Sequence, residues 1–507
     1  ATSAVDNSLF GIREQVTYEI NLPFTDKKMD VAKVGKQLLS YVKTRNLGFN
    51  VIIPMTSLIT GTAQRIIETK VGEFLESRSQ KLGTKEFFKI AGESAKDFGS
   101  LNPKGKLNVL GQVFGSFDLK ESFKNSSYGI LSRTLPRIGM GLHTLSNFPL
   151  YGKAMLGVLH DFRLVEQPDG STKMMRWYDY KIAQMREGKT TKEAKAQWGT
   201  MEADVIYNYI EVVDGQFNFK KQLEEKLTDY NEKEVIDRLT NHITSVNERI
   251  DGQMNNNDRN LASRDYRLNF FNTHRNYFWL ALSHRFKSKS NNPLTGKLEE
   301  GSYITFFKAA KDYLNNFKEL GATNLIKGFK KVWDDAGVDP KTGEIDFEQR
   351  ELVRTNLKRI GIEWAILQVT LLTGLLLSQI GGDEDDPYIL KNLNLLNARL
   401  NNELNSVQTG IVGSAYETLK TPFVGLDTVT NLANVPDLLN DEEIKHGSYR
   451  GMNKRERWLL KQTPGAKSMR DLTELTQTVN TYNFYNEKSY DNPLNPIHYF
   501  ISKNLEE

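Results

Sequence analysis

The side chains that most often carry out chemistry are sparse and scattered in this sequence. Its seven histidines fall in none of the spacings that hold zinc, such as HExxH, and it has no cysteine. No GxSxG elbow, Walker A loop or dinucleotide-binding GxGxxG motif follows a predicted strand. The sequence therefore predicts a protein that is not an enzyme, with no resident metal and no cofactor.

Four consecutive acids form the one cluster whose carboxylates could hold calcium or magnesium, namely Asp383, Glu384, Asp385 and Asp386. Metal-binding loops usually place their ligands at alternate positions, whereas these four are adjacent. We therefore favour the interpretation that they form a solvated cap after the apolar segment that precedes them.

A basic and aromatic stretch, residues 264–289, could contact nucleic acid. It interleaves cations with rings and contains a single acid, and such a pattern suits phosphates and stacked bases. Phe271, Phe278, Leu282 and Phe286 also recur at helical spacing, which favours helix packing with arginines at the edge of the packed face. The candidate nucleic-acid or phosphate contacts are Arg264, Arg267, Arg275, Arg285 and Lys287.

The element that organises the chain is Trp364–Gly382, 19 consecutive residues without a charge. As a helix it would be roughly 28 Å long, close to the ~30 Å hydrocarbon core of a bilayer. Its polar members, such as Gln368, equally suit a helix buried in a large assembly, and both interpretations stay open. The apolar pattern before it predicts one helix from Asp346 to Ile380. The candidate membrane or core residues are Trp364, Ile366, Leu367, Leu371, Leu372, Leu375, Leu376 and Ile380.

Other low-charge segments could pack with this helix into a bundle: residues 47–64, 138–159 and 405–416. Gly152 and Gly157 would let a second helix backbone approach closely.

Local patterns predict the remaining elements. Two Asp-Gly turns predict β-hairpins, and apolar residues at helical spacing predict helices. The frequent glycines of residues 83–132 predict loops and short helices. The hairpins are expected at 163–177 and 210–219, and the helices at 178–209, 220–250, 302–335 and 453–461.

Composition and pattern together predict a mainly α, elongated multi-helix protein with one or two small β-hairpins in the middle region. The mean hydropathy of −0.51 excludes a polytopic transporter, and a net charge of +4 predicts no general attraction to nucleic acid. We divide the chain into five regions: 1–161, apolar helices; 162–252, hairpins and charged helices; 253–345, basic and aromatic helices; 346–435, the apolar helix and a heptad-like partner; 436–507, a polar arm.

One stretch suggests a relationship. Residues 136–163 read PRIGMGLHTLSNFPLYGKAMLGVLHDFR. With the hairpin that follows and the apolar helix ending at Gly382, they resemble the very large virion proteins of crAss-like tailed phages. The resemblance implies cargo that is carried in the capsid or tail and delivered to the host. Because those proteins are typically far longer, it also implies a processed or partial piece of a longer chain.

The expected function is therefore a non-enzymatic virion component that assists genome passage across the cell envelope. Expected partners are other virion proteins of the portal or tail lumen, several copies of the chain in an assembly, the host membrane and DNA. The expected location is the virion, and then the host envelope or cytoplasm. The alternative is a virion-packaged nucleic-acid-binding protein, or the scaffold of a virion polymerase or nuclease, with residues 264–289 as its contact.

Overall fold

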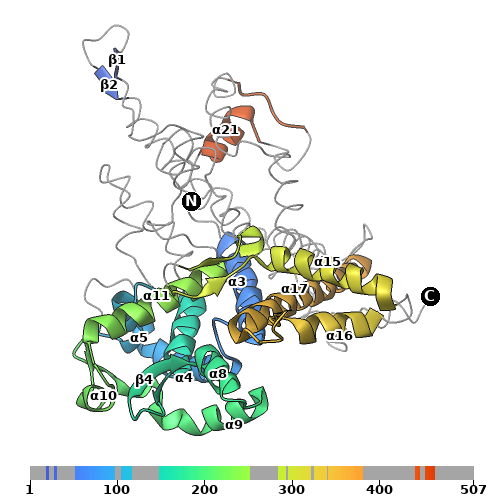
Figure 1. Cartoon of the computed structure of the whole chain (residues 1–507). Helices are drawn as coiled ribbons and strands as arrows, with labels where there is room; N and C mark the ends of the chain where they lie inside the picture. The colour runs from blue at the N-terminus through green and yellow to red at the C-terminus, as the bar shows by residue number, and fades with distance from the viewer. Residues whose placement is uncertain are drawn as a thin grey trace, which may run out of the picture.

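The computed structural model describes residues 19–21, 28–30, 52–96, 104–116, 148–251, 284–292, 295–320, 325–339, 341–380, 440–445 and 452–462. Within these residues the protein is mainly α-helical, and its only sheets are small two-stranded antiparallel ones (Figure 1). The predicted fold class, mainly α with small β-hairpins, is confirmed.

The helices and strands have the following bounds. The helices are α3 (Ile52–Val71), α4 (Ser77–Lys96), α5 (Lys106–Val113), α8 (Trp177–Arg186), α9 (Thr191–Thr200), η1 (Met201–Asp204), η2 (Ile206–Tyr209), α10 (Lys221–Lys226), α11 (Glu232–Asp251), α15 (Ser302–Leu320), α16 (Leu325–Asp335), α17 (Phe347–Ile380) and α21 (Lys454–Gln462). The strands are β1 (Glu19–Asn21), β2 (Lys28–Asp30), β3 (Phe162–Glu166), β4 (Thr172–Arg176), β5 (Ile210–Val213), β6 (Gln216–Phe219), β7 (Ser290–Asn291) and β8 (Leu298–Glu299).

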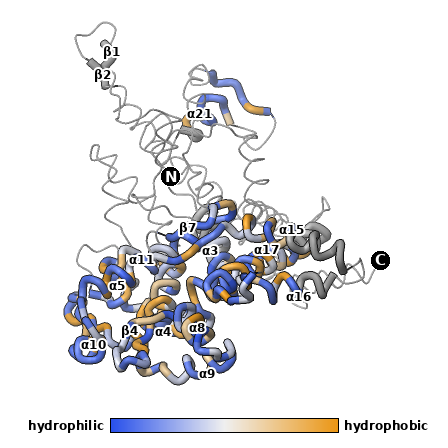
Figure 2. Tube along the Cα trace, viewed as in Figure 1, coloured by the Kyte–Doolittle hydropathy of each residue, from blue (hydrophilic) through white to orange (hydrophobic). Residues whose placement is uncertain are grey.

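The core is built around helical residues 148–161, which are buried on nearly every side. A helix that is apolar all round has to lie inside the fold. Residues of α4, α5, α11 and both central hairpins pack against it in one hydrophobic cluster. The first two predicted regions therefore share a single core. In Figure 2 outer segments such as α10 are mainly hydrophilic.

Two glycines allow α4 to cross the central helix at backbone contact. A Cβ added to Gly83 would lie 2.3 Å from the backbone nitrogen of Gly157, and one added to Gly157 would meet the side chain of Gln80 at 2.5 Å. Only glycine permits so close a crossing. The expected close approach at Gly157 is confirmed, and at Gly152 an added Cβ would meet Phe87 at 2.8 Å.

Both predicted hairpins form. Strand β3 pairs with β4, and β5 pairs with β6, each in antiparallel register. The β5–β6 turn has positive φ at Asp214 (51°) and Gly215 (81°), as a two-residue type I′ turn requires. Two further hairpins, β1–β2 and β7–β8, were not predicted, because strands of three and two residues leave too little alternation to detect.

Two predictions need correction. Residues 83–132 were expected to form loops and short helices, but Gly83 and Gly92 lie inside the 20-residue helix α4. Residues 220–250 were expected to form one helix, but α10 and α11 are separate: Asp229 adopts φ 56°, and the backbone N–H of Thr228 turns to the carbonyl of Thr172. The predicted apolar face is nevertheless correct, with Leu239 fully buried.

Helices α15, α16 and α17 form a second group beside the helices and hairpins that share the hydrophobic core, here called the body (Figure 1). The predicted helix from Asp346 to Ile380 is confirmed as α17, whose 34 residues make it about 51 Å long at helical rise. The first part of α17 also packs against α3 and α8, through residues such as Arg359 and Glu351. Helix α17 therefore links the two groups of helices.

Candidate functional site

The first half of α17 is held to the body by a buried ion cluster. Arg359 donates two hydrogen bonds to Glu68 of α3, at 3.2 and 2.9 Å, and one to Glu73, at 3.0 Å. All three side chains are buried. Burial alone would lower the pKa of Arg359, but the two carboxylates outweigh it and raise that pKa above its ordinary value. The guanidinium stays charged and forms a fixed link between the helices.

A neutral network extends this cluster to α15. Asn356 accepts a hydrogen bond from Arg359 at 3.1 Å, and its own amide donates to the hydroxyl of Thr305 at 2.9 Å and to the backbone carbonyl of Glu300 at 3.0 Å. Because each buried polar group is used, the network fixes the position of α17 along its axis.

Two ion pairs join α17 to α8. Lys181 pairs with Glu351 in a buried position, and Arg186 pairs with Glu348 at 2.8 Å on the surface. The buried pair is the stronger constraint, since exposed pairs contribute about 0–1 kcal/mol. Together with the Arg359 cluster, these contacts hold the first half of α17 on three sides.

Burial ends abruptly at Glu363. Leu352 and Ile360 are 2% and 7% exposed, whereas Trp364 and Leu372 are 57% and 60% exposed. The Glu363 carboxyl is itself buried, which raises its pKa in spite of the nearby arginines. Beyond its firmly anchored first half, helix α17 thus continues without a charge, and of its described side chains in that part Trp364, Val369 and Leu372 are exposed.

The structure places the eight candidate apolar residues on this second half. Trp364 and Leu372 are exposed and Ile366 is partly buried, while the side chains of the other five lie outside the described part: Leu367, Leu371, Leu375, Leu376 and Ile380. Among the helices that the structure describes, none is both long enough and apolar enough to cross a membrane.

Two of the five candidate phosphate contacts fall within the described residues. Arg285 is 5% exposed and lies 3.7 Å from Glu363, and Lys287 lies 3.3 Å from Glu299. Phe286 packs edge-on against Tyr303. Within the described residues, Arg285 and Phe286 therefore make packing contacts inside the protein. Arg264, Arg267 and Arg275 lie outside the described residues.

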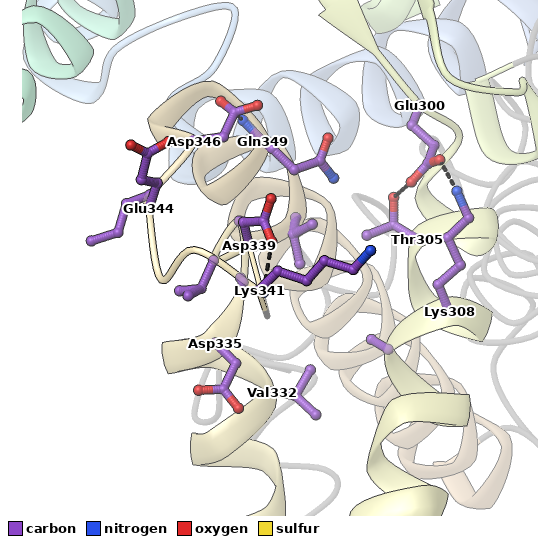
Figure 3. A pocket seen from close by; sticks show the side chains of 16 residues that line it. Glu300, Thr305, Lys308, Val332, Asp335, Asp339, Lys341, Glu344, Asp346 and Gln349 are labelled. Carbon is purple, nitrogen blue, oxygen red and sulfur yellow. Dashed lines mark hydrogen bonds and ion pairs between the residues drawn. The ribbon is translucent and has the colours of Figure 1, made fainter.

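A cavity of about 1120 Å³ lies between α15, α16 and the start of α17 (Figure 3). Several of its charged side chains form hydrogen bonds or ion pairs with neighbouring residues of the protein. Glu300 accepts a hydrogen bond from Thr305 and pairs with Lys308, and Asp339 accepts the backbone N–H of Lys341 at 2.8 Å. Its described lining residues include no histidine, cysteine or serine.

No group of three or more metal-binding side chains occurs within the described residues, and the acidic run at 383–386 lies outside them. The sequence reading missed the anchoring role of Arg359 and Glu363. The sequence did contain a signal for it. Arg359 and Glu363 follow Leu352 and Asn356 at helical spacing, so all four side chains lie on the same buried face of the helix.

Comparison with protein-family models, with curated proteins and with solved structures finds no match to this chain.

Proposed function

We propose that this chain is a non-enzymatic virion component of a tailed phage. It is carried as cargo in the capsid or tail and delivered to the host, where it assists passage of the genome across the cell envelope. The resemblance of residues 136–163 to phage virion proteins gives the class, and the second half of α17 gives the mode of action.

The observation that carries the proposal is the change from burial to exposure at Glu363. Beyond it, 17 residues of α17 contain no charge, and large apolar side chains such as Trp364 and Leu372 are exposed. Large apolar side chains that are exposed close together on one segment typically mark a site that another apolar surface covers. In the particle the covering surface is another virion protein, and after delivery it is the host membrane.

The rigid anchor supports the same role. An apolar helix that projects from a flexible chain would fold back on its own core, whereas the ion cluster of Arg359 keeps the first half of α17 in one position. The exposed side chains of Trp364 and Leu372 would then be presented to a partner from a fixed position.

Flotation with anionic phospholipid vesicles tests the membrane step. The full chain is expected to float with the vesicles, and Leu372→Glu is expected to reduce the floated fraction about tenfold or more, because a leucine that would insert into the lipid is replaced by a charge. Phe88→Glu is the matched control, since Phe88 is exposed on α4 and its replacement would still face Lys153.

Mass spectrometry of purified phage particles tests the location separately. Absence of the chain from particles would contradict its role as virion cargo. Failure of the unmodified chain to float, or equal loss of flotation in the Phe88→Glu control, would contradict the part assigned to α17.

A further inference from the structure

The cavity between α15, α16 and the start of α17 carries an excess of negative charge. Five carboxylates and two lysine ammonium groups line it (Figure 3). Glu300 is buried and uses both of its carboxylate oxygens inside the protein, one for Thr305 and one for Lys308. The other four carboxylates are exposed, and among the lining residues Lys341 is the one cation left to balance them.

A fixed turn positions three of these exposed acids. The backbone N–H of Asp339 donates to the carbonyl of Glu344 at 2.9 Å, and that of Asp346 donates to the carbonyl of Gly337 at 2.8 Å. A Cβ added to Gly337, whose φ is 71°, would lie 2.5 Å from the backbone oxygen of Asp346. Because the turn is tied to the start of α17, its carboxylates are arranged before any ligand arrives.

Three acceptor groups of the cavity have no donor within the described part of the protein. The side-chain carboxylates of Asp335 and Glu344 make no hydrogen bond or ion pair there. The amide oxygen Oε1 of Gln349 is buried and likewise has no partner among the described residues. A buried acceptor without a donor costs free energy, so a donor supplied by a ligand would be favourable at this position.

Apolar side chains line the same cavity. Ala309 of α15 and Val332 of α16 are each 8% exposed, and Ile345 of the turn is 40% exposed. The alkyl stems of lysine and arginine pack on surfaces of this kind while their charged heads reach nearby carboxylates. The combination of acids and apolar wall therefore suits basic side chains.

The size of the cavity and the arrangement of its acids favour an extended ligand. Within the described residues, no three acidic or histidine side chains are gathered closely enough to hold a metal ion. The volume of about 1120 Å³ also exceeds the roughly 300–1,000 Å³ of typical small-molecule sites. A chain that carries several cations along its length matches both observations.

We propose that this cavity is a docking groove for a basic segment of another protein. Lysine or arginine side chains of that segment pair with Asp335 and Glu344, and one of its N–H groups donates to Oε1 of Gln349. The groove lies at the anchored end of α17, before the exposed residues that follow Glu363. It can therefore be occupied whether or not α17 enters a membrane.

Fluorescence anisotropy of the full chain with a labelled octapeptide of alternating lysine and alanine tests the groove. Salt is kept at about 0.15 M, where exposed charges more than about 8 Å apart are largely screened. The peptide is expected to bind saturably. Asp335→Asn combined with Glu344→Gln is expected to weaken binding about threefold or more, because peptide cations lose their partners. Lys341→Gln is expected to strengthen it about twofold, since a competing ammonium group is removed.

Asp334→Asn combined with Glu348→Gln is the matched control. It removes the same charge from neighbouring positions of α16 and α17 that do not line the cavity, and it should change the dissociation constant by less than about 1.5-fold. The proposal would be overturned by a lack of saturable binding to the unmodified protein, by equal weakening in both double variants, or by equal binding of an octapeptide of alternating glutamate and alanine. Displacement of the peptide by an equimolar amount of spermine would identify a free polyamine as the ligand and overturn it as well.

Discussion

Single charged residues determine how α17 is held. Arg359 is the central member of its cluster, because Glu68 and Glu73 both depend on it for a counter-charge. Replacing buried pairs by apolar groups can be neutral, but removing one partner leaves an uncompensated charge in the interior. The loss of stability therefore depends on which residue of the Arg359, Glu68 and Glu73 cluster is replaced.

Arg359→Met is expected to lower the free energy of unfolding by about 3–5 kcal/mol, since two buried carboxylates would lose their only shared cation. Urea denaturation followed by circular dichroism measures the loss. Adding Glu68→Gln and Glu73→Gln to this variant should recover part of it. Lys89→Met is the control, because Lys89 is 61% exposed in its pair with Glu86 and its loss should change stability by about 1 kcal/mol or less. A comparably small effect for Arg359→Met would mean that the cluster does not anchor α17.

At the scale of elements, local signals were sufficient for some features. The Asp-Gly turns at 169–170 and 214–215 predicted both central hairpins, and the uninterrupted apolar pattern predicted α17 within one residue of its start. Such signals depend on the residues within the element itself.

Features that depend on distant partners could not be predicted. Arg359 and Glu68 are 291 positions apart, so no local pattern indicated that burial along α17 would end at Glu363 and that Trp364 would be exposed. The glycines of α4 were read as turn residues, although Gly83 is required by a backbone that comes from residue 157. A glycine that allows a turn and a glycine that allows close helix packing cannot be distinguished in a single sequence.

Helix α4 permits a matched test of this close crossing. Gly83→Ala is expected to destabilise the protein by about 1–3 kcal/mol, because the added methyl group meets backbone that cannot move aside. Gly92→Ala on the same helix meets nothing within 4 Å and should stabilise it by up to about 1 kcal/mol through helix propensity. Thermal or urea unfolding of both variants provides the comparison. The same sign of change for the two would mean that the helices do not cross at Gly83.

At the scale of the whole molecule, buried titratable groups couple folding to pH. Burial lowers the pKa of His160 to about 4 and those of His242 and His284 well below the ordinary 6.5. Between about pH 4 and about pH 6.5, the unfolded chain therefore binds up to three protons that the folded protein does not. Asp161 acts in the opposite direction, since in the same range only the folded protein holds its proton.

The net uptake of about two protons on unfolding means that stability is expected to fall on acidification, by roughly 3 kcal/mol per pH unit at the steepest point. Urea midpoints measured across this range would show the slope. Asp161→Asn should make it steeper by about 1.4 kcal/mol per unit, because it removes an opposing proton. A stability that rises as the pH falls from 6.5 would contradict the neutral state of the three buried histidines, whose partners, such as the carbonyl of Phe74 for His242, lie within the folded core.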